Sequence, residues 1–277
     1  MATYDTLLVE VDDGVATVTL NRPDQRNAIN LVMQRELHDA IWGLDADESV
    51  RAIVVTGSGT AFCSGIDMME GGFGADFQAE HDKELGVTSE TVWESVAFWE
   101  LATPVLGAIN GAAIGAGLTL PLLFDCCFVA EDARLQFMFT RLGVAPDANS
   151  TWLVPRMIGL PRALELLLSG RAFTGAEAAS IGLCARALPT DEVLAATQEL
   201  ARDIAENTAP LAVAVTKRLV HEFAHVEERP GAMTRETKLI WWLGSRPDAT
   251  EGPMARIEKR PPHWSDEKHT PLPPELG

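Results

Sequence analysis

The feature that most constrains the fold is a recurring unit in which a short apolar strand, a glycine-bearing turn and a helical run follow one another. Residues 51–59, "RAIVVTGSG", form a β-branched run that ends in glycine, and residues 103–130, "TPVLGAINGAAIGAGLTLPLLFDCCFVA", contain a strand, a glycine-rich turn, an apolar helix and a further strand. Strands that alternate with helices are joined by crossover connections, which place the strands parallel in one sheet. The sequence therefore predicts an α/β fold with a largely parallel sheet.

The N-terminal segment carries two further local patterns. In residues 6–23, apolar residues alternate on both sides of the turn Asp12-Asp13-Gly14, which predicts a β-hairpin. Residues 27–47 carry apolar side chains at helical spacing and predict an amphipathic helix. Its expected inward-facing residues are Ile29, Val32, Met33, Leu37, Ala40, Ile41 and Leu44.

The second half of the chain is predicted to be mainly helical. Helices are expected to begin at Thr174 and at Thr190-Asp191, and a separate helical module is expected to begin near residue 200. This divides the chain into a core domain at 1–199 and a helical module with a tail at 200–277. The proline-rich end predicts an extended tail. Residues 70–90 are polar and glycine-bearing, and we expect them to form a mobile segment over the surface.

The overall charge argues against two classes of partner. The chain has 22 Lys and Arg against 40 Asp and Glu, a formal net charge of −18, so nucleic acid and anionic membranes would repel it. The most apolar stretch, residues 104–130, is interrupted by Asn110, Pro121 and Asp125, and predicts buried strand and helix instead of a membrane span. A small anionic ligand would need a local cation.

The cysteines and the N-terminus bear on the compartment. We expect a cytoplasmic protein, because the N-terminus lacks the cationic and apolar regions of a signal peptide. The cysteines lack metal-ligand spacing and are expected to be buried thiols, with no metal site. They are Cys63, Cys126, Cys127 and Cys184.

Two glycine-bearing turns could hold a ligand through their backbone. In "TGSGTAFCSGIDMM" the small residues Ser64 and Gly65 would let the amide of Ile66 point into a cleft, and Gly115 and Ala116 in "INGAAIGAGLTL" could do the same at a helix start. Two amides that converge on one oxygen would form an oxyanion hole, which stabilises an enolate. The alternative is that both are tight strand-to-helix turns, and spacing alone favours that alternative.

Few titratable side chains stand out. Asp147 lies in "RLGVAPDANSTW", where it could handle a proton or could cap the helix that follows, and the local pattern favours the cap. For His38 and His221 we expect solvated or packed histidines. For Asp67 and Asp125 we expect capping of nearby backbone.

Four motifs taken in order resemble the enoyl-CoA hydratase/isomerase family, the crotonases. They are "NRPDQRNAI", "AFCSGIDM", "INGAAIGAGLTLPLLFDCCFVAEDARL" and "LSGRAFTGAEAASIGL", followed by "EKRPPHW" near the end. The resemblance implies a crotonase-like spiral of ββα units and a C-terminal helical module that builds homotrimers, often paired into hexamers. It also implies an acyl-CoA thioester substrate, with coenzyme A as part of the substrate and no tightly bound cofactor.

The resemblance assigns roles to particular residues. It implies that the amides of Ile66 and Ala116 form the oxyanion hole. It places contacts with the substrate or its CoA at Arg26, Ala28, Ser64, Gly65, Asp67, Gly115 and Phe139. Arg26 would offset the negative charge of the chain near the phosphates.

The sequence departs from the hydratases of this family at two positions. Where they carry a pair of glutamates that hold water, this chain has Thr119 and Phe139, neither of which can act as acid or base at neutral pH. Asp147 instead resembles the acid of the isomerases, and we expect its pKa to be raised by apolar neighbours such as Phe139 and Trp152. An isomerase that shifts a double bond is the leading interpretation. A hydratase, a CoA-thioester hydrolase and a catalytically silent acyl-CoA binder are the alternatives, and the acyl group stays open.

Overall fold

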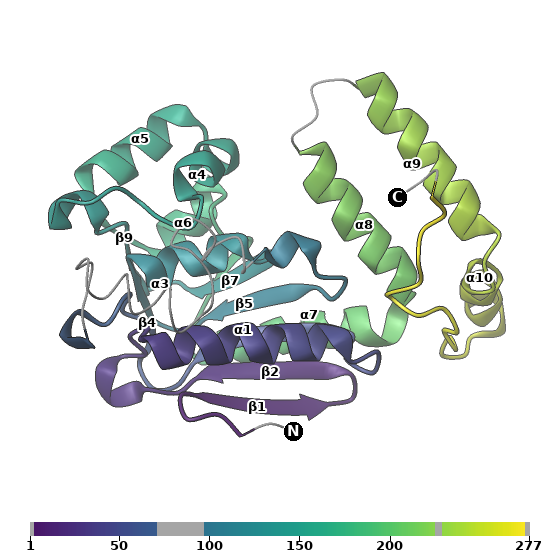
Figure 1. Ribbon diagram of the computed structural model, residues 1–277, viewed down its shortest axis with the longest axis horizontal. Helices are drawn as coiled ribbons and strands as arrows, with labels where there is room; N and C mark the ends of the chain where they lie inside the picture. The colour runs from purple at the N-terminus through teal and green to yellow at the C-terminus, as the bar shows by residue number, and fades with distance from the viewer. Residues whose placement is uncertain (1–2, 71–96, 225–228, 275–277) are drawn as a thin grey trace.

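The computed structural model describes residues 3–70, 97–224 and 229–274 (Figure 1). Its larger sheet has six strands in the order β1-β2-β3-β5-β7-β10. All neighbours are parallel except the β1–β2 pair, so the predicted parallel sheet is confirmed. The strands are β1 (Leu7–Asp12), β2 (Val15–Leu20), β3 (Ala52–Gly57), β5 (Val105–Ile109), β7 (Cys126–Ala130) and β10 (Arg186–Leu188).

The predicted N-terminal hairpin is confirmed. Strands β1 and β2 pair antiparallel from Leu7 opposite Leu20 to Asp12 opposite Val15. The two residues between them, Asp13 and Gly14, have φ angles of 44° and 80°. Left-handed values at both central positions are what a two-residue hairpin turn needs, because they match the twist of the flanking strands.

A second, smaller sheet turns the parallel strands into a repeating unit. Its order is β4-β6-β8-β9. Each of its first three strands follows a long strand of the larger sheet: β4 after β3, β6 after β5 and β8 after β7. The expected spiral of ββα units is therefore confirmed. The short strands are β4 (Ala61–Cys63), β6 (Ala112–Ile114), β8 (Arg134–Gln136) and β9 (Ala172–Thr174).

Helices cover the sheets and form most of the second half of the described chain (Figure 1). The α-helices are α1 (Leu31–Ala46), α3 (Ala116–Thr119), α4 (Ser150–Ile158), α5 (Leu160–Ser169), α6 (Gly175–Ile181), α7 (Val193–Asn207), α8 (Pro210–Phe223), α9 (Arg229–Gly244) and α10 (Asp248–Glu258). The short 3-10 helices are η1 (Pro23–Gln25), η2 (Met68–Glu70), η4 (Phe98–Glu100), η5 (Leu120–Leu123) and η6 (Phe139–Leu142). None of the described helices is long and apolar enough to cross a bilayer.

Three predicted helix starts can be compared with the structure. The start expected at Thr190-Asp191 is slightly early, because α7 begins at Val193 after Glu192 and no side chain caps it. Helix α1 begins later than the apolar pattern, because the Asn30 side chain accepts from the Met33 amide at 2.9 Å and caps it there. The α1 residues Met33, Leu37, Ala40 and Ile41 are buried, as predicted. Thr174 caps α6 as expected, through its hydroxyl oxygen.

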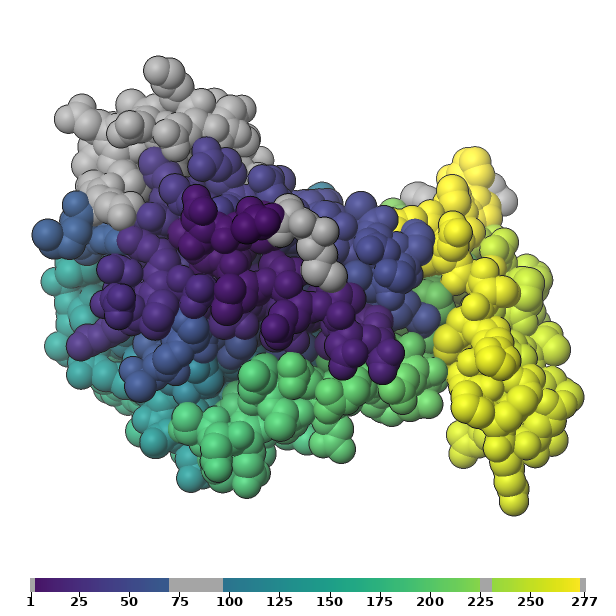
Figure 2. All heavy atoms as spheres, turned by 90° about the horizontal axis from the view of Figure 1, so that it is seen from below, coloured from purple at the N-terminus to yellow at the C-terminus, as the bar shows by residue number. Residues whose placement is uncertain are grey.

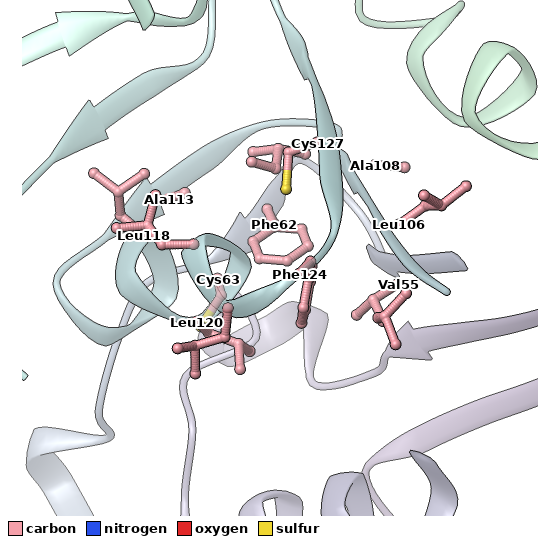
Figure 3. Packing of buried hydrophobic residues seen from close by; sticks show 14 of the residues in the cluster. Val55, Phe62, Cys63, Leu106, Ala108, Ala113, Leu118, Leu120, Phe124 and Cys127 are labelled. Carbon is pink, nitrogen blue, oxygen red and sulfur yellow. The ribbon is translucent and has the colours of Figure 1, made fainter. Parts of the chain in front are cut away.

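The main hydrophobic core includes side chains next to both glycine-bearing turns, namely Cys63, Ala116 and Leu118. Figure 3 shows part of it, with Phe62, Phe124 and Cys127 among the packed side chains. All four cysteines are free thiols and three are buried, as expected. Burial raises the pKa of the Cys63 thiol to about 12, so it stays protonated at neutral pH. The turns that bear the candidate site are thus supported by closely packed apolar side chains.

The expected domain boundary at residue 200 falls inside α7. That helix contacts β2, β3, β5 and β7, and the side-chain amide of its Gln198 donates to the Thr17 hydroxyl of β2 at 3.0 Å. A separate apolar cluster begins only after α7, with Leu211, Val215 and Leu239. By its packing, the helical lobe therefore comprises α8, α9 and α10. The C-terminal residues, yellow in Figure 2, lie to one side of the core.

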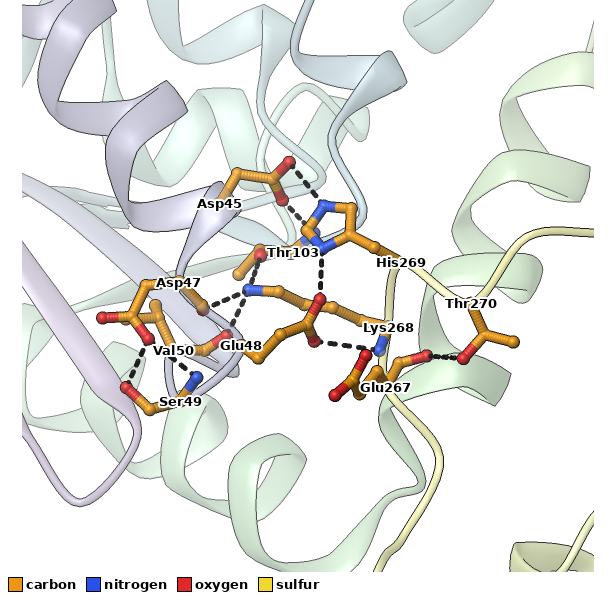
Figure 4. A network of polar contacts seen from close by, with 10 residues as sticks. All are labelled: Asp45, Asp47, Glu48, Ser49, Val50, Thr103, Glu267, Lys268, His269 and Thr270. Carbon is orange, nitrogen blue, oxygen red and sulfur yellow. Dashed lines mark hydrogen bonds and ion pairs between the residues drawn. The ribbon is translucent and has the colours of Figure 1, made fainter.

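The C-terminal segment after α10 lacks helix and strand through residue 274, in line with an extended tail, but it is anchored. The Lys268 side chain is 4% exposed and donates to the carbonyls of Asp47 and Val50 at 2.8 and 2.6 Å. It also donates to the Thr103 hydroxyl at 2.8 Å. The next residue, His269, lies 2.7 Å from Glu48 (Figure 4). These contacts attach the tail to the end of α1 and the start of β5.

Candidate active site

The two glycine-bearing turns predicted to hold a ligand lie directly against each other. Gly65 has a φ of 96°, and a Cβ at this position would lie 2.7 Å from the Ile114 carbonyl oxygen and 3.6 Å from the Ala116 nitrogen. A Cβ on Gly117 would lie 2.2 Å from the Cys63 carbonyl oxygen. Only glycine fits such approaches. These glycines therefore bring the loop after β4 against the start of α3.

The amides of Ile66 and Ala116 are both unbonded within the described part of the chain. Ile29 donates to the Gly65 carbonyl at 2.8 Å and accepts from the Asp67 amide at 2.9 Å, so the Ile66 N–H between them points away from Ile29. Ala116 is the first residue of α3, where an N–H has no partner within the helix. Two free donors on adjoining turns can hold one ligand oxygen.

The Asp147 side chain faces α3 instead of the helix that follows it. Its Oδ1 accepts a hydrogen bond from the Thr119 hydroxyl at 2.5 Å. The residue that precedes α4 is Asn149, which makes no side-chain capping bond. Ser150 donates from its amide and hydroxyl to the Asp147 carbonyl, at 2.9 and 2.6 Å. The interpretation of the Asp147 carboxylate as a helix cap is therefore wrong.

The backbone after Asp147 is strained. Ala148 has a φ of 48°, which an alanine disfavours because its Cβ approaches backbone oxygen. Asn149, with a φ of 58°, adopts this region more readily. Ala148 is 3% exposed, so packing as well as the two Ser150 bonds holds this conformation. Strain of this kind gathers where a side chain must be held in place.

The surroundings of Asp147 change its acidity. Burial raises the pKa of its carboxyl group to about 6, and hydrogen bonds from Thr119 and from its own amide oppose that rise. A carboxylate with this pKa is mostly ionised at neutral pH and is a stronger base than an exposed aspartate. Phe139 is buried at 2% exposure, and Trp152 lies under the Arg156 guanidinium. Their expected effect on this pKa stays a prediction.

Residues expected near CoA are partly brought together beside the first glycine turn. The Ser64 amide donates to the Arg26 carbonyl at 3.0 Å, and the Ser64 hydroxyl donates to the Gln25 carbonyl at 3.2 Å. Arg26 has a φ of 52° and is exposed. No side chain in the described part of the chain forms an ion pair with the Arg26 guanidinium, so this group is available to an anionic ligand.

Asp67 and Ala28 belong to an ion-pair network that the sequence did not reveal. Arg22 donates to Asp67 Oδ2 at 2.9 Å and to the Ala28 carbonyl at 2.6 Å. The other Asp67 oxygen accepts from the Met69 amide at 3.0 Å, in line with the expected backbone capping. The Asp67 carboxylate and the Ala28 carbonyl therefore hold the turn at Ile66 in place through Arg22. Arg22 lies in the quoted "NRPDQRNAI" motif, but nothing in that motif identifies its partner.

Two other candidates fall outside the site. The His221 ring lies 3.0 Å from Asp125, which also pairs with the buried Lys217 at 2.8 Å and accepts from the Val105 amide at 2.8 Å. His38 is half-exposed beside Asp39. These placements match the packed and solvated histidines expected from the sequence.

A large cavity of about 1250 Å³ lies between the core and the helical lobe. Trp99, Leu123, Trp152, Val215 and Leu272 are among the residues that line it. Its lining does not include Ile66, Ala116, Thr119 or Asp147. The free amides and the buried Asp147 carboxylate, and not cavity size, therefore locate the candidate site. The predicted surface segment, residues 70–90, lies outside the described residues apart from Glu70.

Comparison with known proteins gives consistent matches over nearly the whole chain. A family model described as enoyl-CoA hydratase/isomerase matches residues 10–267. The chain is 36% identical over 264 residues to a probable enoyl-CoA hydratase of Rhodobacter capsulatus, covering 95% of this chain and 98% of the relative. It is 34% identical to an enoyl-CoA hydratase of Alternaria alternata, covering 93% and 85% of the two chains.

Solved structures give the same picture. A probable enoyl-CoA hydratase/isomerase from Mycobacterium abscessus is 39% identical, with a TM-score of 0.83 and coverage of 94% of this chain and 99% of the other. An enoyl-CoA hydratase from Bacillus anthracis is 30% identical, with a TM-score of 0.85 and coverage of 94% and 99%.

Proposed function

The chain belongs to the enoyl-CoA hydratase/isomerase family, and from that premise we propose that it shifts a double bond of an enoyl-CoA between the 3,4 and 2,3 positions. Asp147 acts as the single acid/base in this proposal. The amides of Ile66 and Ala116 act as the oxyanion hole. Coenzyme A is part of the substrate, and no other cofactor is needed.

The proposed reaction balances with one proton and one carboxylate. The ionised Asp147 removes a proton from the α-carbon of a 3-enoyl thioester, and the electron pair moves toward the carbonyl to give a dienolate. The two amides stabilise the oxyanion. The protonated Asp147 then returns the proton to the γ-carbon, which leaves the double bond conjugated with the carbonyl. No water enters the products.

The observation that carries the proposal is the pairing of Asp147 with Thr119. Thr119 stands at the position where the resemblance expects the first hydratase glutamate, and its hydroxyl lies 2.5 Å from the Asp147 carboxylate. Phe139 stands at the second such position and is 2% exposed. Among the described residues, the site thus contains one carboxylate where a hydratase would use two. A pKa of about 6 suits that carboxylate to taking and returning a proton near neutral pH.

Hydration is the second candidate, and the names of the relatives favour it. The Rhodobacter capsulatus and Alternaria alternata proteins are both called enoyl-CoA hydratases. Addition of water to a 2-enoyl thioester needs a base for the water and an acid for the α-carbon. Here Asp147 would have to serve both roles, so we propose hydration as a slower side activity at most.

The test supplies 3-enoyl-CoA and 2-enoyl-CoA separately and follows the ultraviolet absorbance of the conjugated thioester. We expect absorbance to rise with the 3-enoyl substrate and to fall little with the 2-enoyl substrate. Asp147→Asn should lower the isomerisation rate roughly a thousandfold. Asp132→Asn is the matched control, because Asp132 accepts from Thr190 at 2.8 Å on the surface, away from the site.

Three results would separate the alternatives. Rapid loss of 2-enoyl absorbance with little isomerisation would support a hydratase. Release of free CoA thiol would support a hydrolase. Tight binding of acyl-CoA with neither substrate changed would support a silent binder.

We also propose that the chain assembles as a homotrimer, or as a hexamer of two trimers, through the helical lobe. Large apolar side chains on α8, α9 and α10 are exposed to solvent in the single chain, which is unfavourable unless a partner covers them. They include Val220 at 63%, Met233 at 69%, Ile240 at 64%, Trp241 at 76% and Ile257 at 73% exposure. We propose the cytoplasm as its compartment, since the thiols are unpaired.

A further inference from the structure

We infer that Thr119 is a positioning residue that orients the Asp147 carboxylate for proton transfer. The inference rests on the proposed function, because it assigns a role to a neighbour of the proposed base. At the matching position the family's hydratases use a glutamate, whereas this chain offers a hydroxyl. The hydroxyl acts here through Asp147 and not on the substrate.

The Thr119 hydroxyl has two acceptors within reach and one proton to donate. Its Oγ1 lies 2.5 Å from Asp147 Oδ1 and 3.4 Å from the Ala116 carbonyl oxygen. A bond to an ionised carboxylate is shorter and stronger than one to a neutral carbonyl, and 2.5 Å is typical of such an O–H···O⁻ contact. The proton therefore goes to Asp147.

Thr119 is itself rigidly placed. Its side chain is fully buried, and β-branching leaves it few rotamers. No other side chain in the described part of the molecule donates to the Asp147 carboxylate. The direction of the carboxylate thus depends on this hydroxyl and on the strained turn at Ala148 and Asn149.

The same short helix carries one proposed oxyanion donor and the hydroxyl that bonds the proposed base. Helix α3 begins at Ala116, whose amide is one oxyanion donor, and ends at Thr119. The amide and the hydroxyl are therefore less than one helical turn apart. Through Thr119, the base is fixed relative to the oxygen that must carry charge when the proton leaves. A displacement of the base by about 1 Å can cost a large part of the rate.

The hydroxyl has a second, electrostatic effect. Burial raises the pKa of Asp147, and the Thr119 hydrogen bond opposes this rise because it stabilises the charged form. Removal of the hydroxyl should therefore raise the pKa above about 6. A residue that only filled space would leave this pKa unchanged.

The experiment compares Thr119→Val, which keeps the shape but loses the hydroxyl, with Thr119→Ser, which keeps the hydroxyl. We expect Thr119→Val to lower kcat for 3-enoyl-CoA isomerisation about tenfold or more, and to move the acid limb of its pH profile upward. Thr119→Ser should restore most of the rate and the position of the limb. Thr197→Val is the matched control, since Thr197 is equally buried and its hydroxyl bonds only the Val193 carbonyl of its own helix.

A second measurement does not need catalysis. The stability difference between the chain and its Asp147→Asn variant depends on pH through the Asp147 pKa. We expect the midpoint of that dependence to rise when the same pair is compared in the Thr119→Val background. Chemical unfolding across pH 4 to 8 would measure it.

The outcomes separate the two proposals. Absence of isomerisation by the unmodified chain would reject the proposed function. The unfolding midpoint would still decide whether the Thr119 hydroxyl lowers the pKa of Asp147. Isomerisation with an unchanged rate and limb in Thr119→Val would reject the positioning role alone. An unfolding midpoint that is the same in both backgrounds would reject it as well.

Discussion

The Asp147 carboxylate accepts the Thr119 hydroxyl at 2.5 Å, which joins a turn before α4 to the end of α3 across 28 residues of sequence. This contact directs the carboxylate toward the helix whose first amide belongs to Ala116. Because of this contact, the carboxylate does not cap α4, the helix that follows it in sequence. The proposed base and one proposed oxyanion donor therefore share a single structural support.

The pH dependence of isomerisation should report on this carboxylate. Only ionised Asp147 can accept a proton, and its pKa is raised to about 6 by burial. We expect kcat/KM for a 3-enoyl-CoA to increase with pH through about 6 and to level off above pH 7. Stopped-flow absorbance from pH 4.5 to 8.5 would measure the curve. An acid limb near pH 4 would show that the base is an exposed carboxylate and not Asp147.

Replacement of Asp147 should stabilise the protein at neutral pH. Its folded pKa is raised from 3.8 to about 6, so between these pH values the folded state holds a proton that the unfolded state has lost. Stability therefore falls as pH rises through this window, and the loss is complete above it. Asp147→Asn should then be more stable than the unmodified chain at pH 8 by on the order of 2 kcal/mol, a difference that disappears near pH 4.

Urea unfolding at the two pH values would check this expectation. Asp132→Asn, on the surface, serves as the control and should show little such pH dependence. A variant that is less stable at pH 8 than at pH 4, relative to the parent chain, would mean that the folded protein favours the ionised form of Asp147.

The fold was predictable from sequence where local patterns suffice. The hairpin at Asp13-Gly14, the buried face of α1 and the strand–turn–helix units all follow from residues close together in the chain. The boundary at residue 200 was less predictable, because the apolar face of α7 could cover either the sheet or a separate lobe. Only its packing against β3 and β5 assigns it to the core.

The site was predictable in part, for a related reason. The glycine turns and Asp147 could be named from the sequence, since special backbone conformations and isolated charges leave local signals. Pairings between distant segments leave none. Arg22 meets Asp67 across 45 residues, and Lys268 reaches Thr103 across 165. Such contacts require the spiral to bring turns together before any partner can be identified.

The two positive-φ glycines of the proposed oxyanion turns should respond differently to substitution. Gly65 and Gly115 have φ angles of 96° and 55°. A Cβ on Gly65 would lie 2.7 Å from the Ile114 carbonyl oxygen, whereas nothing lies within 4 Å of a Cβ on Gly115. Gly115→Ala should therefore cost only the backbone strain of φ 55° with ψ −125°, a combination outside the αL well, or about 1–3 kcal/mol of stability. Gly65→Ala should cost more and should also separate the two amides, with a roughly hundredfold loss of kcat.

Circular dichroism melts and isomerisation rates would measure both effects. The pair forms its own control, because each variant adds one methyl group at a left-handed position. Equal rates in the two variants would contradict the idea that close approach of the two turns builds the oxyanion hole.

The Lys268 anchor should stabilise the chain without taking part in chemistry. Its ammonium group is buried and donates to two carbonyls and the Thr103 hydroxyl. Lys268→Met keeps the length of the side chain but leaves those acceptors unsatisfied, and should lower the free energy of unfolding by about 3 kcal/mol. Lys238→Met, at an exposed position on α9, should change it little. Urea unfolding would measure both variants, and equal effects would contradict a specific anchor.

The exposed apolar side chains of the lobe should control assembly. Trp241 of α9 is 76% exposed in the single chain, and Ile240 beside it is 64% exposed. If a second copy covers this surface, Trp241→Lys would bury an unpaired charge in the interface and should shift the protein toward monomers. Sedimentation velocity would give the mass, with Leu8→Lys as the control, since Leu8 is 51% exposed on the edge strand β1. We expect a trimer or hexamer for the unmodified chain and for the control. A Trp241→Lys variant that keeps the full mass would exclude this part of the lobe from the interface.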